Sequence, residues 1–173
     1  MQARDIAPHE ILLPVRAAFI IFTFIAALLI NLLPWSGWWL IIKPDFVALV
    51  VLYWCIQQPR KVGFSAAWVL GLIMDVGESS LFGQHALAYS VLAFAGIVLH
   101  RRVLMFTMRD QILHVLVLLV LNDVMVLAVR MVAGATFPGF SYFIGSLTAA
   151  ALWPALTFLF KLPQRPAPDP DRV

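Results

Sequence analysis

Six apolar runs, separated by short polar connections, occupy almost the whole of this 173-residue chain. Hydrophobic residues make up 62% of it and charged residues only 12%, whereas an ordinary globular domain is about half apolar and a quarter charged. A helix needs roughly 20 apolar residues to cross a bilayer. The sequence therefore predicts an all-α integral membrane protein with about six transmembrane helices in one bundle.

The expected spans cover residues 15–33, 45–57, 62–76, 84–100, 111–129 and 142–160. The second and third are short, because 13 to 15 residues rise only about 20 Å. They either extend into their loops, thin the bilayer locally or form a partly re-entrant pair. Residues 1–162 are expected to form one transmembrane domain, and the Pro- and charge-rich stretch 163–173 a disordered cytoplasmic tail.

Lysine and arginine are distributed unevenly between alternate connections. With a cytoplasmic N-terminus, the inner side holds Arg4, Arg16, Arg60, Lys61, Arg101, Arg102, Arg109, Lys161, Arg165 and Arg172. The outer side holds only Lys43 and Arg130. Because basic loops stay inside, both termini are predicted to be cytoplasmic in a multi-pass plasma-membrane protein. These residues orient the spans, so the net charge of +3 does not indicate nucleic-acid binding.

Polar residues gather at the ends of the spans that this orientation places outside. The turn between the third and fourth spans is central, and it lies within Gly71–Ala95. The candidate cluster, for partner binding or structural support, comprises Asp45, Asp75, Gln84, His85, Asp123 and Arg130. An ionisable group within a membrane is by default a candidate functional residue.

A structural interpretation stands beside the functional one for each residue. Asp45 suits the positive end of its helix dipole, Gln84 and His85 can cap a helix start, and Asp123 can form an interhelical hydrogen bond or pair with Arg130. Asp75 is hardest to explain in this way, because the end of its own helix disfavours an anion. It requires a partner from another span, for which His85 or Arg130 is the natural candidate.

Small residues at helix-packing spacing are expected to allow close helix contacts. They are Ala86, Ser90, Ala93, Gly145 and Ala149. No catalytic motif, phosphate-binding glycine loop or pair of metal-binding histidines on one helix is present in the sequence. We therefore expect no enzyme activity, no cofactor and no metal. The single cysteine, Cys55, lies within an apolar run and excludes an intrachain disulfide.

Several ordered elements between residues 43 and 94 resemble the rod shape-determining protein MreD family. They are Pro44-Asp45, Tyr53-Trp54, Pro59-Arg60, Gly71-Leu72 with Asp75, and Gly83-Gln84-His85-Ala86-Leu87. The resemblance extends more loosely to the size, the six-span pattern and the position of Asn122-Asp123. Glu78 departs from the family pattern, which is expected to have an apolar or small residue there.

The resemblance implies a non-enzymatic inner-membrane component of the bacterial cell-elongation complex. It also implies binding to MreC, association with RodA, its penicillin-binding transpeptidase and MreB, and support of lateral peptidoglycan synthesis. The residues themselves add the hypothesis that Asp75, Gln84 and His85 shape an outward surface for the partner, while the small-residue faces receive the partner's span. The alternative is a vitamin-type substrate-binding subunit, since the architecture resembles those of energy-coupling-factor transporters. Trp54, Trp68 and Trp153 are the candidate walls of its pocket.

Overall fold

The computed structural model describes residues 15–164, and all regular secondary structure in this range is helical. Most of the tail predicted at residues 163–173 lies outside the described residues. The elements are α1 (Ala17–Asn31), α2 (Trp38–Ile42), α3 (Phe46–Gln57), α4 (Phe64–Gly77), α5 (Gln84–Met105), α6 (Met108–Val132), the 3₁₀ turn η1 (Phe140–Phe143), α7 (Ile144–Lys161) and the 3₁₀ turn η2 (Leu162–Gln164). The prediction of an all-α membrane bundle is confirmed.

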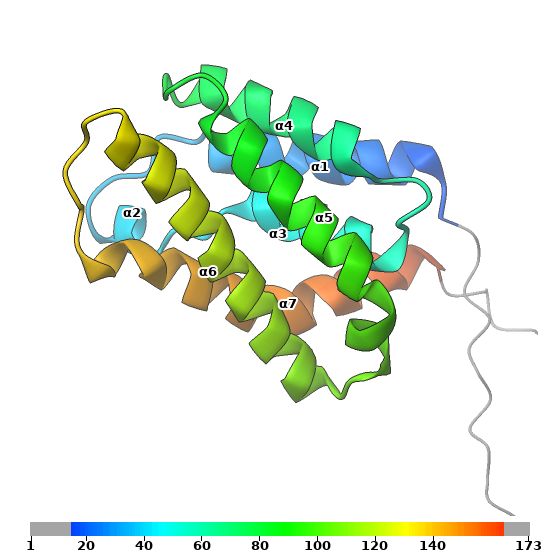
Figure 1. The fold of residues 1–173 in the computed structure, drawn as a ribbon. Helices are drawn as coiled ribbons and strands as arrows, with labels where there is room; N and C mark the ends of the chain where they lie inside the picture. Colours follow the sequence, from blue (N-terminus) through cyan, green and yellow to red (C-terminus); the bar gives the residue numbers. More distant parts are fainter. Residues whose placement is uncertain (1–14, 165–173) are drawn as a thin grey trace, which may run out of the picture.

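Helix α3 lies at the centre of the bundle. It packs against α1, α5, α6 and α7, and α5 crosses in front of it in Figure 1. Every residue from Val47 to Ile56 is buried, which explains why the run is apolar on all sides rather than amphipathic. The central helix is therefore enclosed by protein, and the surrounding helices form the outer surface of the bundle.

The helices follow the predicted spans closely, with one difference in the pattern of lengths. Four segments are long and apolar enough to cross a membrane: Trp38–Gln57, Gln84–Met105, Met108–Val132 and Phe140–Gln164. The second span was predicted to be short, but α2 precedes α3 and the two together cover 20 residues. Ala17–Asn31 and Phe64–Gly77 are the shorter apolar helices. The two short spans are therefore the first and the third, rather than the second and the third.

The predicted basic loop from His100 to Asp110 is mostly helical, so that prediction was wrong. Helix α5 continues to Met105 and α6 begins at Met108. Arg101 and Arg102 are exposed on the last turns of α5, where long basic side chains extend toward water without ending the helix. Thr107 Oγ1 donates to Asp110 Oδ2 at 2.7 Å, and this bond helps to fix the start of α6.

Aromatic side chains fill the core between α1, α3 and α7. Trp54 stacks on Phe160 with ring centroids 5.6 Å apart, and Tyr53 meets Trp153 at 5.7 Å. Trp54 Nε1 also donates to Thr23 Oγ1 at 2.9 Å, which joins α3 to α1. Trp54 and Trp153 are fully buried, while Trp68 is half exposed on α4. None of the three tryptophans lines the cavity described below.

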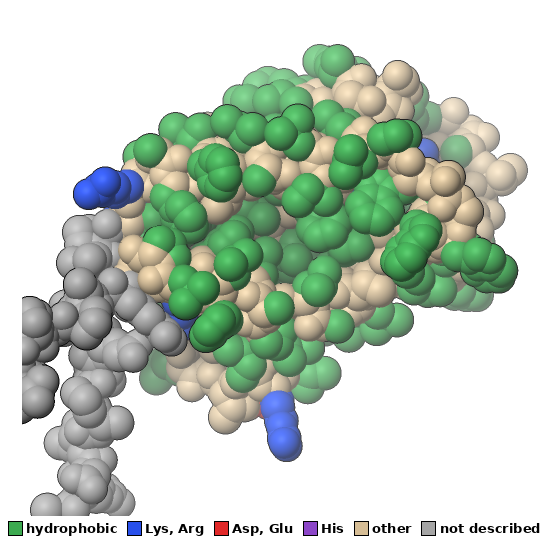
Figure 2. Space-filling model, turned by 180° about the vertical axis from the view of Figure 1, so that it is seen from behind, with side chains coloured by type: hydrophobic (Ala, Val, Ile, Leu, Met, Phe, Trp, Pro, Cys, Tyr) green, Lys and Arg blue, Asp and Glu red, His purple; other side chains and the backbone are tan. Residues whose placement is uncertain are grey.

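The outer surface of the bundle is largely apolar. Figure 2 shows hydrophobic side chains across the face opposite to that of Figure 1, with a hollow between them. An apolar groove lies on the α1, α3 and α7 helices and includes Phe22, Ala26, Val50, Ala155 and Leu159. A surface of this kind is normal for a protein whose solvent is lipid.

Candidate functional site

The carboxylate of Asp75 binds the start of the next helix. Its oxygens accept hydrogen bonds from the backbone N–H groups of Gly83 at 2.8 Å, His85 at 2.9 Å and Ala86 at 3.4 Å. The first N–H groups of a helix have no partner within it, and they carry the positive end of its dipole. These hydrogen bonds to the start of α5 explain how an acidic residue is tolerated at the C-terminal end of α4.

Two side chains complete this arrangement around Asp75. His85 Nδ1 lies 2.8 Å from Asp75 Oδ1, and Ser80 Oγ donates to the same oxygen at 3.0 Å. Because a carboxylate only accepts, Nδ1 carries the hydrogen. Asp75 is 1% exposed, so its charge is almost fully enclosed by donors. We call Asp75, Ser80 and the first turn of α5 the α4–α5 clasp.

Close packing of α4 on α5 supports the clasp. A Cβ atom on Gly71 would overlap with the backbone N and Cα of Ala86. Ser90 Oγ donates to Ala86 O at 2.7 Å, within α5. Ala93, on the same helix, is fully buried. Ala86 therefore lies directly at the crossing of the two helices.

Two other small residues lie near the start of α7. A Cβ atom on Gly145 would come within 2.7 Å of Lys43 O. Ala149 is buried one turn further along α7. These positions bring α7 against the connection between α2 and α3.

Asp45 joins three helices at the end of the bundle that the charge bias predicts to face outward, here called the outer end. It caps α3 by accepting from Ala48 N at 3.0 Å. Asn31 Nδ2 of α1 donates to Asp45 Oδ1 at 3.1 Å, and Tyr89 Oη of α5 donates to Oδ2 at 2.7 Å. Asn31 Oδ1 in turn accepts from Phe46 N at 3.2 Å.

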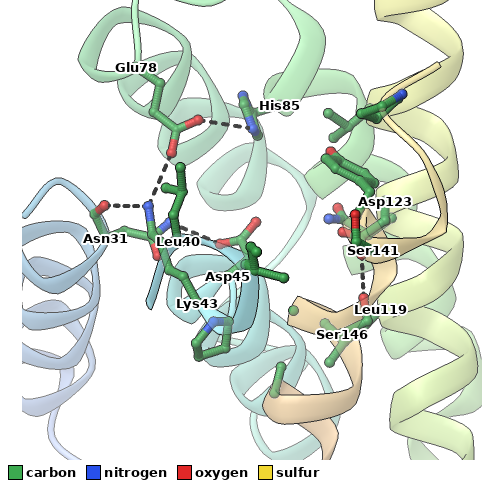
Figure 3. Close-up of a pocket in the computed structure, with 18 residues that line it drawn as sticks. Asn31, Leu40, Lys43, Asp45, Glu78, His85, Leu119, Asp123, Ser141 and Ser146 are labelled. Carbon is green, nitrogen blue, oxygen red and sulfur yellow. Dashed lines mark hydrogen bonds and ion pairs between the residues drawn. The ribbon is translucent and has the colours of Figure 1, made fainter. Parts of the chain in front are cut away.

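A cavity of about 390 Å³ opens beside Asp45, and we call it the outer cavity (Figure 3). Its polar walls come from α1, the α2–α3 connection, the α4–α5 turn, the start of α5, α6, η1 and α7. The polar and charged lining residues are Asn31, Lys43, Asp45, Glu78, His85, Asn122, Asp123, Ser141, Tyr142 and Ser146. The volume lies within the range of roughly 300–1,000 Å³ that is typical of ligand pockets.

Charged groups line one side of the outer cavity. Lys43 Nζ lies 3.5 Å from Glu78 Oε1 and donates to the carbonyl oxygen of Asn31 at 2.7 Å. His85 Nε2 lies 3.8 Å from Glu78 Oε2. Figure 3 shows these residues on the same side as Asp45, with Asp123 opposite. Glu78 thus connects the cavity to His85 of the α4–α5 clasp.

Asp123 and Asn122 line the opposite side, on α6. Ser146 Oγ of α7 donates to Asp123 Oδ2, which is the interhelical hydrogen bond expected as one alternative. Asn122 is 2% exposed, and its Oδ1 has no hydrogen-bond partner among the described residues. This side of the cavity therefore presents acceptors without a matching cation.

The structure separates the remaining predicted residues from the cavity. Gln84 is 1% exposed, and within residues 15–164 neither polar atom of its side chain has a hydrogen-bond partner. Arg130 is exposed on the last turns of α6 and forms no ion pair with any described residue. Of the two partners considered for Asp75, His85 is the one in contact. Asp75 and Gln84 do not line the outer cavity, whereas Asp45, His85 and Asp123 do.

Sequence reasoning missed several residues of the site. They are Asn31, Lys43, Glu78, Tyr89, Asn122, Tyr142 and Ser146. Asn31 had a usable signal, since it is a strongly polar residue in an apolar span. Ser146 and Tyr89 had none, because hydroxyl groups are common in membrane helices. No group of three or more potential metal ligands occurs among the described residues.

The comparisons with known proteins agree on one family. A family model described as rod shape-determining protein MreD matches residues 15–162, which includes every helix of the bundle. The chain belongs to the MreD family. A curated protein named rod shape-determining protein MreD, from Haemophilus influenzae, is 28% identical over 142 residues, which cover 80% of this chain and 85% of the relative.

The search of solved structures found no significant match. The architectural likeness to vitamin-transporter subunits therefore stays a prediction. Family membership identifies the chain as a membrane component of the rod shape-determining system, and MreD proteins are shape-determining components rather than a known enzyme family.

Proposed function

We propose that this protein is a non-enzymatic component of the cell-elongation complex in the bacterial inner membrane, where it binds MreC and supports lateral peptidoglycan synthesis. The observation that carries the proposal is the family match across the whole helical bundle. Through MreC, the complex also includes RodA, its penicillin-binding transpeptidase and MreB. The chain crosses the membrane six times, with both ends in the cytoplasm and the outer cavity facing the periplasm.

The shape of the molecule suits a scaffold. The polar groups within the bundle are used mainly to hold helices together, as in the α4–α5 clasp and the Asp45 network. In this proposal His85 and Glu78 contribute to the surface that meets the extracytoplasmic part of the partner. Asp75 supports that surface from behind, since it fixes His85 at 2.8 Å. Gln84 lies next to His85 in the same turn.

A capture experiment from native membranes tests the proposal. The tagged full chain is purified in mild detergent, and both the proteins and the small molecules that accompany it are identified by mass spectrometry. We expect MreC to be recovered with the wall-synthase pair. Recovery of the folded chain without MreC would contradict the proposal. The His85→Ala variant, compared with His114→Ala in the second turn of α6, which does not line the outer cavity, shows whether the proposed surface contributes.

A second candidate function is the substrate-binding subunit of a small-molecule transporter. The observation that favours it is the 390 Å³ cavity at the outer end. The tryptophans expected as its walls do not line that cavity, because Trp54 and Trp153 belong to the aromatic core. A stoichiometric vitamin-like molecule together with an ATPase module in the same capture experiment would replace the scaffold proposal with this one.

A further inference from the structure

The charges lining the outer cavity do not balance. Three carboxylates, Asp45, Glu78 and Asp123, face one ammonium group, that of Lys43. The acidic side chains of the lining thus outnumber its one ammonium group. Buried or half-buried charges in a bundle surrounded by lipid are costly unless a counter-charge lies nearby. The lining therefore lacks positive charge.

The two basic side chains of the lining already have acidic partners. Lys43 pairs with Glu78 at 3.5 Å, and His85 is held by Asp75 at 2.8 Å. Asp45 and Asp123 receive hydrogen bonds from neutral donors, but no cationic group of the described residues lies within 4.0 Å of either carboxylate. The surplus negative charge is thus located at these two residues.

A second observation points to a missing donor. Asn122 lines the same cavity, and its buried Oδ1 has no hydrogen-bond partner among the described residues. A buried acceptor without a donor costs free energy unless a ligand or a water molecule supplies one. Asn122 and Asp123 are consecutive on α6, so one bound group that donates several hydrogen bonds can serve both.

We propose that the outer cavity binds an organic cation, an ammonium or guanidinium group that donates to Asp123, Asp45 and Asn122 Oδ1. These groups carry positive charge and several N–H donors but no acceptor, which complements the lining. An anion would be repelled by Asp45 and Asp123, the two carboxylates without a cationic partner. The chemistry fits a lysine or arginine side chain of a neighbouring protein as well as a free amine.

Thermal unfolding of the purified full chain in detergent tests the proposal. The thiol of Cys55 is fully buried, so its reaction with a fluorogenic maleimide reports unfolding without an added label. The probe is butylguanidinium, and its neutral analogue butylurea is the control. We expect butylguanidinium to raise the unfolding midpoint by roughly 2–4 °C at concentrations several-fold above its Kd, and butylurea to leave it unchanged.

Two variants keep the test decisive. Asp123→Asn keeps the side-chain shape but removes the charge, and it should weaken the response to butylguanidinium at least tenfold. Asp45→Asn retains a residue that caps helices well and should also weaken it. Equal shifts with both compounds, no shift in the folded wild-type chain, or an undiminished response in both variants would overturn the proposal. Because no complex is involved, this result is separate from the outcome of the MreC capture.

A crosslinking experiment in native membranes distinguishes the two sources of the cation. Benzoylphenylalanine replaces Tyr142, which lines the cavity and is half-buried. A protein adduct that is lost with Asp123→Asn identifies a side chain of a neighbouring protein. A co-purifying small amine that is lost with Asp123→Asn identifies a free ligand. Either result supports a cation site. Adducts and small molecules unaffected by Asp123→Asn would contradict it.

Discussion

Two acidic sites lie at the outer end of this bundle, the α4–α5 clasp and the outer cavity, and they differ in how many donors surround their carboxylates. In the α4–α5 clasp, Asp75 accepts three backbone N–H bonds and contacts His85 and Ser80, so its carboxylate is enclosed. In the outer cavity, Asp45 accepts three hydrogen bonds and Asp123 accepts one from Ser146, so both carboxylates are less enclosed than that of Asp75. The number of donors around a carboxylate, rather than its depth in the membrane, thus distinguishes the structural role of Asp75 from the binding role that we propose for Asp45 and Asp123.

The largest expected effect comes from opening the clasp. Asp75→Asn replaces one accepting oxygen by an N–H₂ group that faces backbone donors, and it removes the charge that stabilises the α5 N-terminus. We expect a loss of about 3 kcal/mol in the free energy of unfolding, read as earlier exposure of the Cys55 thiol on heating. Asp110→Asn, on the exposed first turn of α6, is the matched control and should cost less than about 1 kcal/mol. Equal losses in Asp75→Asn and Asp110→Asn would show that the clasp contributes no more to stability than an ordinary exposed helix start.

The next effect concerns the packing behind the clasp. Gly71→Ala places a methyl group on the backbone of Ala86, so α4 and α5 must separate, at a cost of about 2 kcal/mol. Gly63→Ala adds the same methyl group where nothing lies within 4 Å. This control should change the free energy of unfolding by no more than about 0.5 kcal/mol. An unaffected Gly71→Ala variant would mean that the helices do not cross as closely as described.

A smaller effect is expected where the cavity meets the core. Tyr89→Phe removes the hydroxyl group that donates to Asp45 at 2.7 Å. We expect a loss of about 1–2 kcal/mol, as for a hydrogen bond to a charged group, measured by the same thiol assay. Tyr142→Phe removes a hydroxyl group that forms no side-chain hydrogen bond with the described residues, so it should change stability little. If Tyr142→Phe cost more stability than Tyr89→Phe, the hydrogen bond from Tyr89 would not be the one that supports Asp45.

The smallest effect is expected at the rim of the cavity. Glu78→Gln breaks the ion pair with Lys43. The side chains of Glu78 and Lys43 are both partly exposed to solvent. Such pairs contribute about 0–1 kcal/mol, so the unfolding midpoint should hardly change, and any change should shrink as salt is added. A large loss that is insensitive to salt would show that Glu78 belongs to the clasp.

The sequence predicted the helices well because each one needs a long apolar run, and breakers such as Pro34 and Pro59 separate those runs. It failed at His100–Asp110, where charged residues remain compatible with helix ends at the membrane surface. It left the length of the second span open, because Lys43-Pro44-Asp45 interrupts the apolar run. In the structure α2 ends at Ile42 and α3 begins at Phe46, and the two together reach the length of a span.

The candidate site could be predicted only in part. Asp45, Asp75 and Asp123 stood out as charges in apolar runs, and His85 was a natural partner for Asp75. The cavity depends on residues far apart in the chain, such as Asn31 and Ser146, whose sides cannot be assigned when a helix is apolar all round. The different surroundings of the carboxylates depend on hydrogen-bond partners that become visible only in three dimensions.

The unfolding midpoint of Asp123→Asn, compared with that of Asp75→Asn in the same thiol assay, tests this account most directly. If the cavity carboxylate is uncompensated in the isolated chain, removal of its charge should leave the midpoint equal to or higher than that of the wild type, while Asp75→Asn lowers it. A loss in Asp123→Asn as large as that in Asp75→Asn would show that both carboxylates are structural.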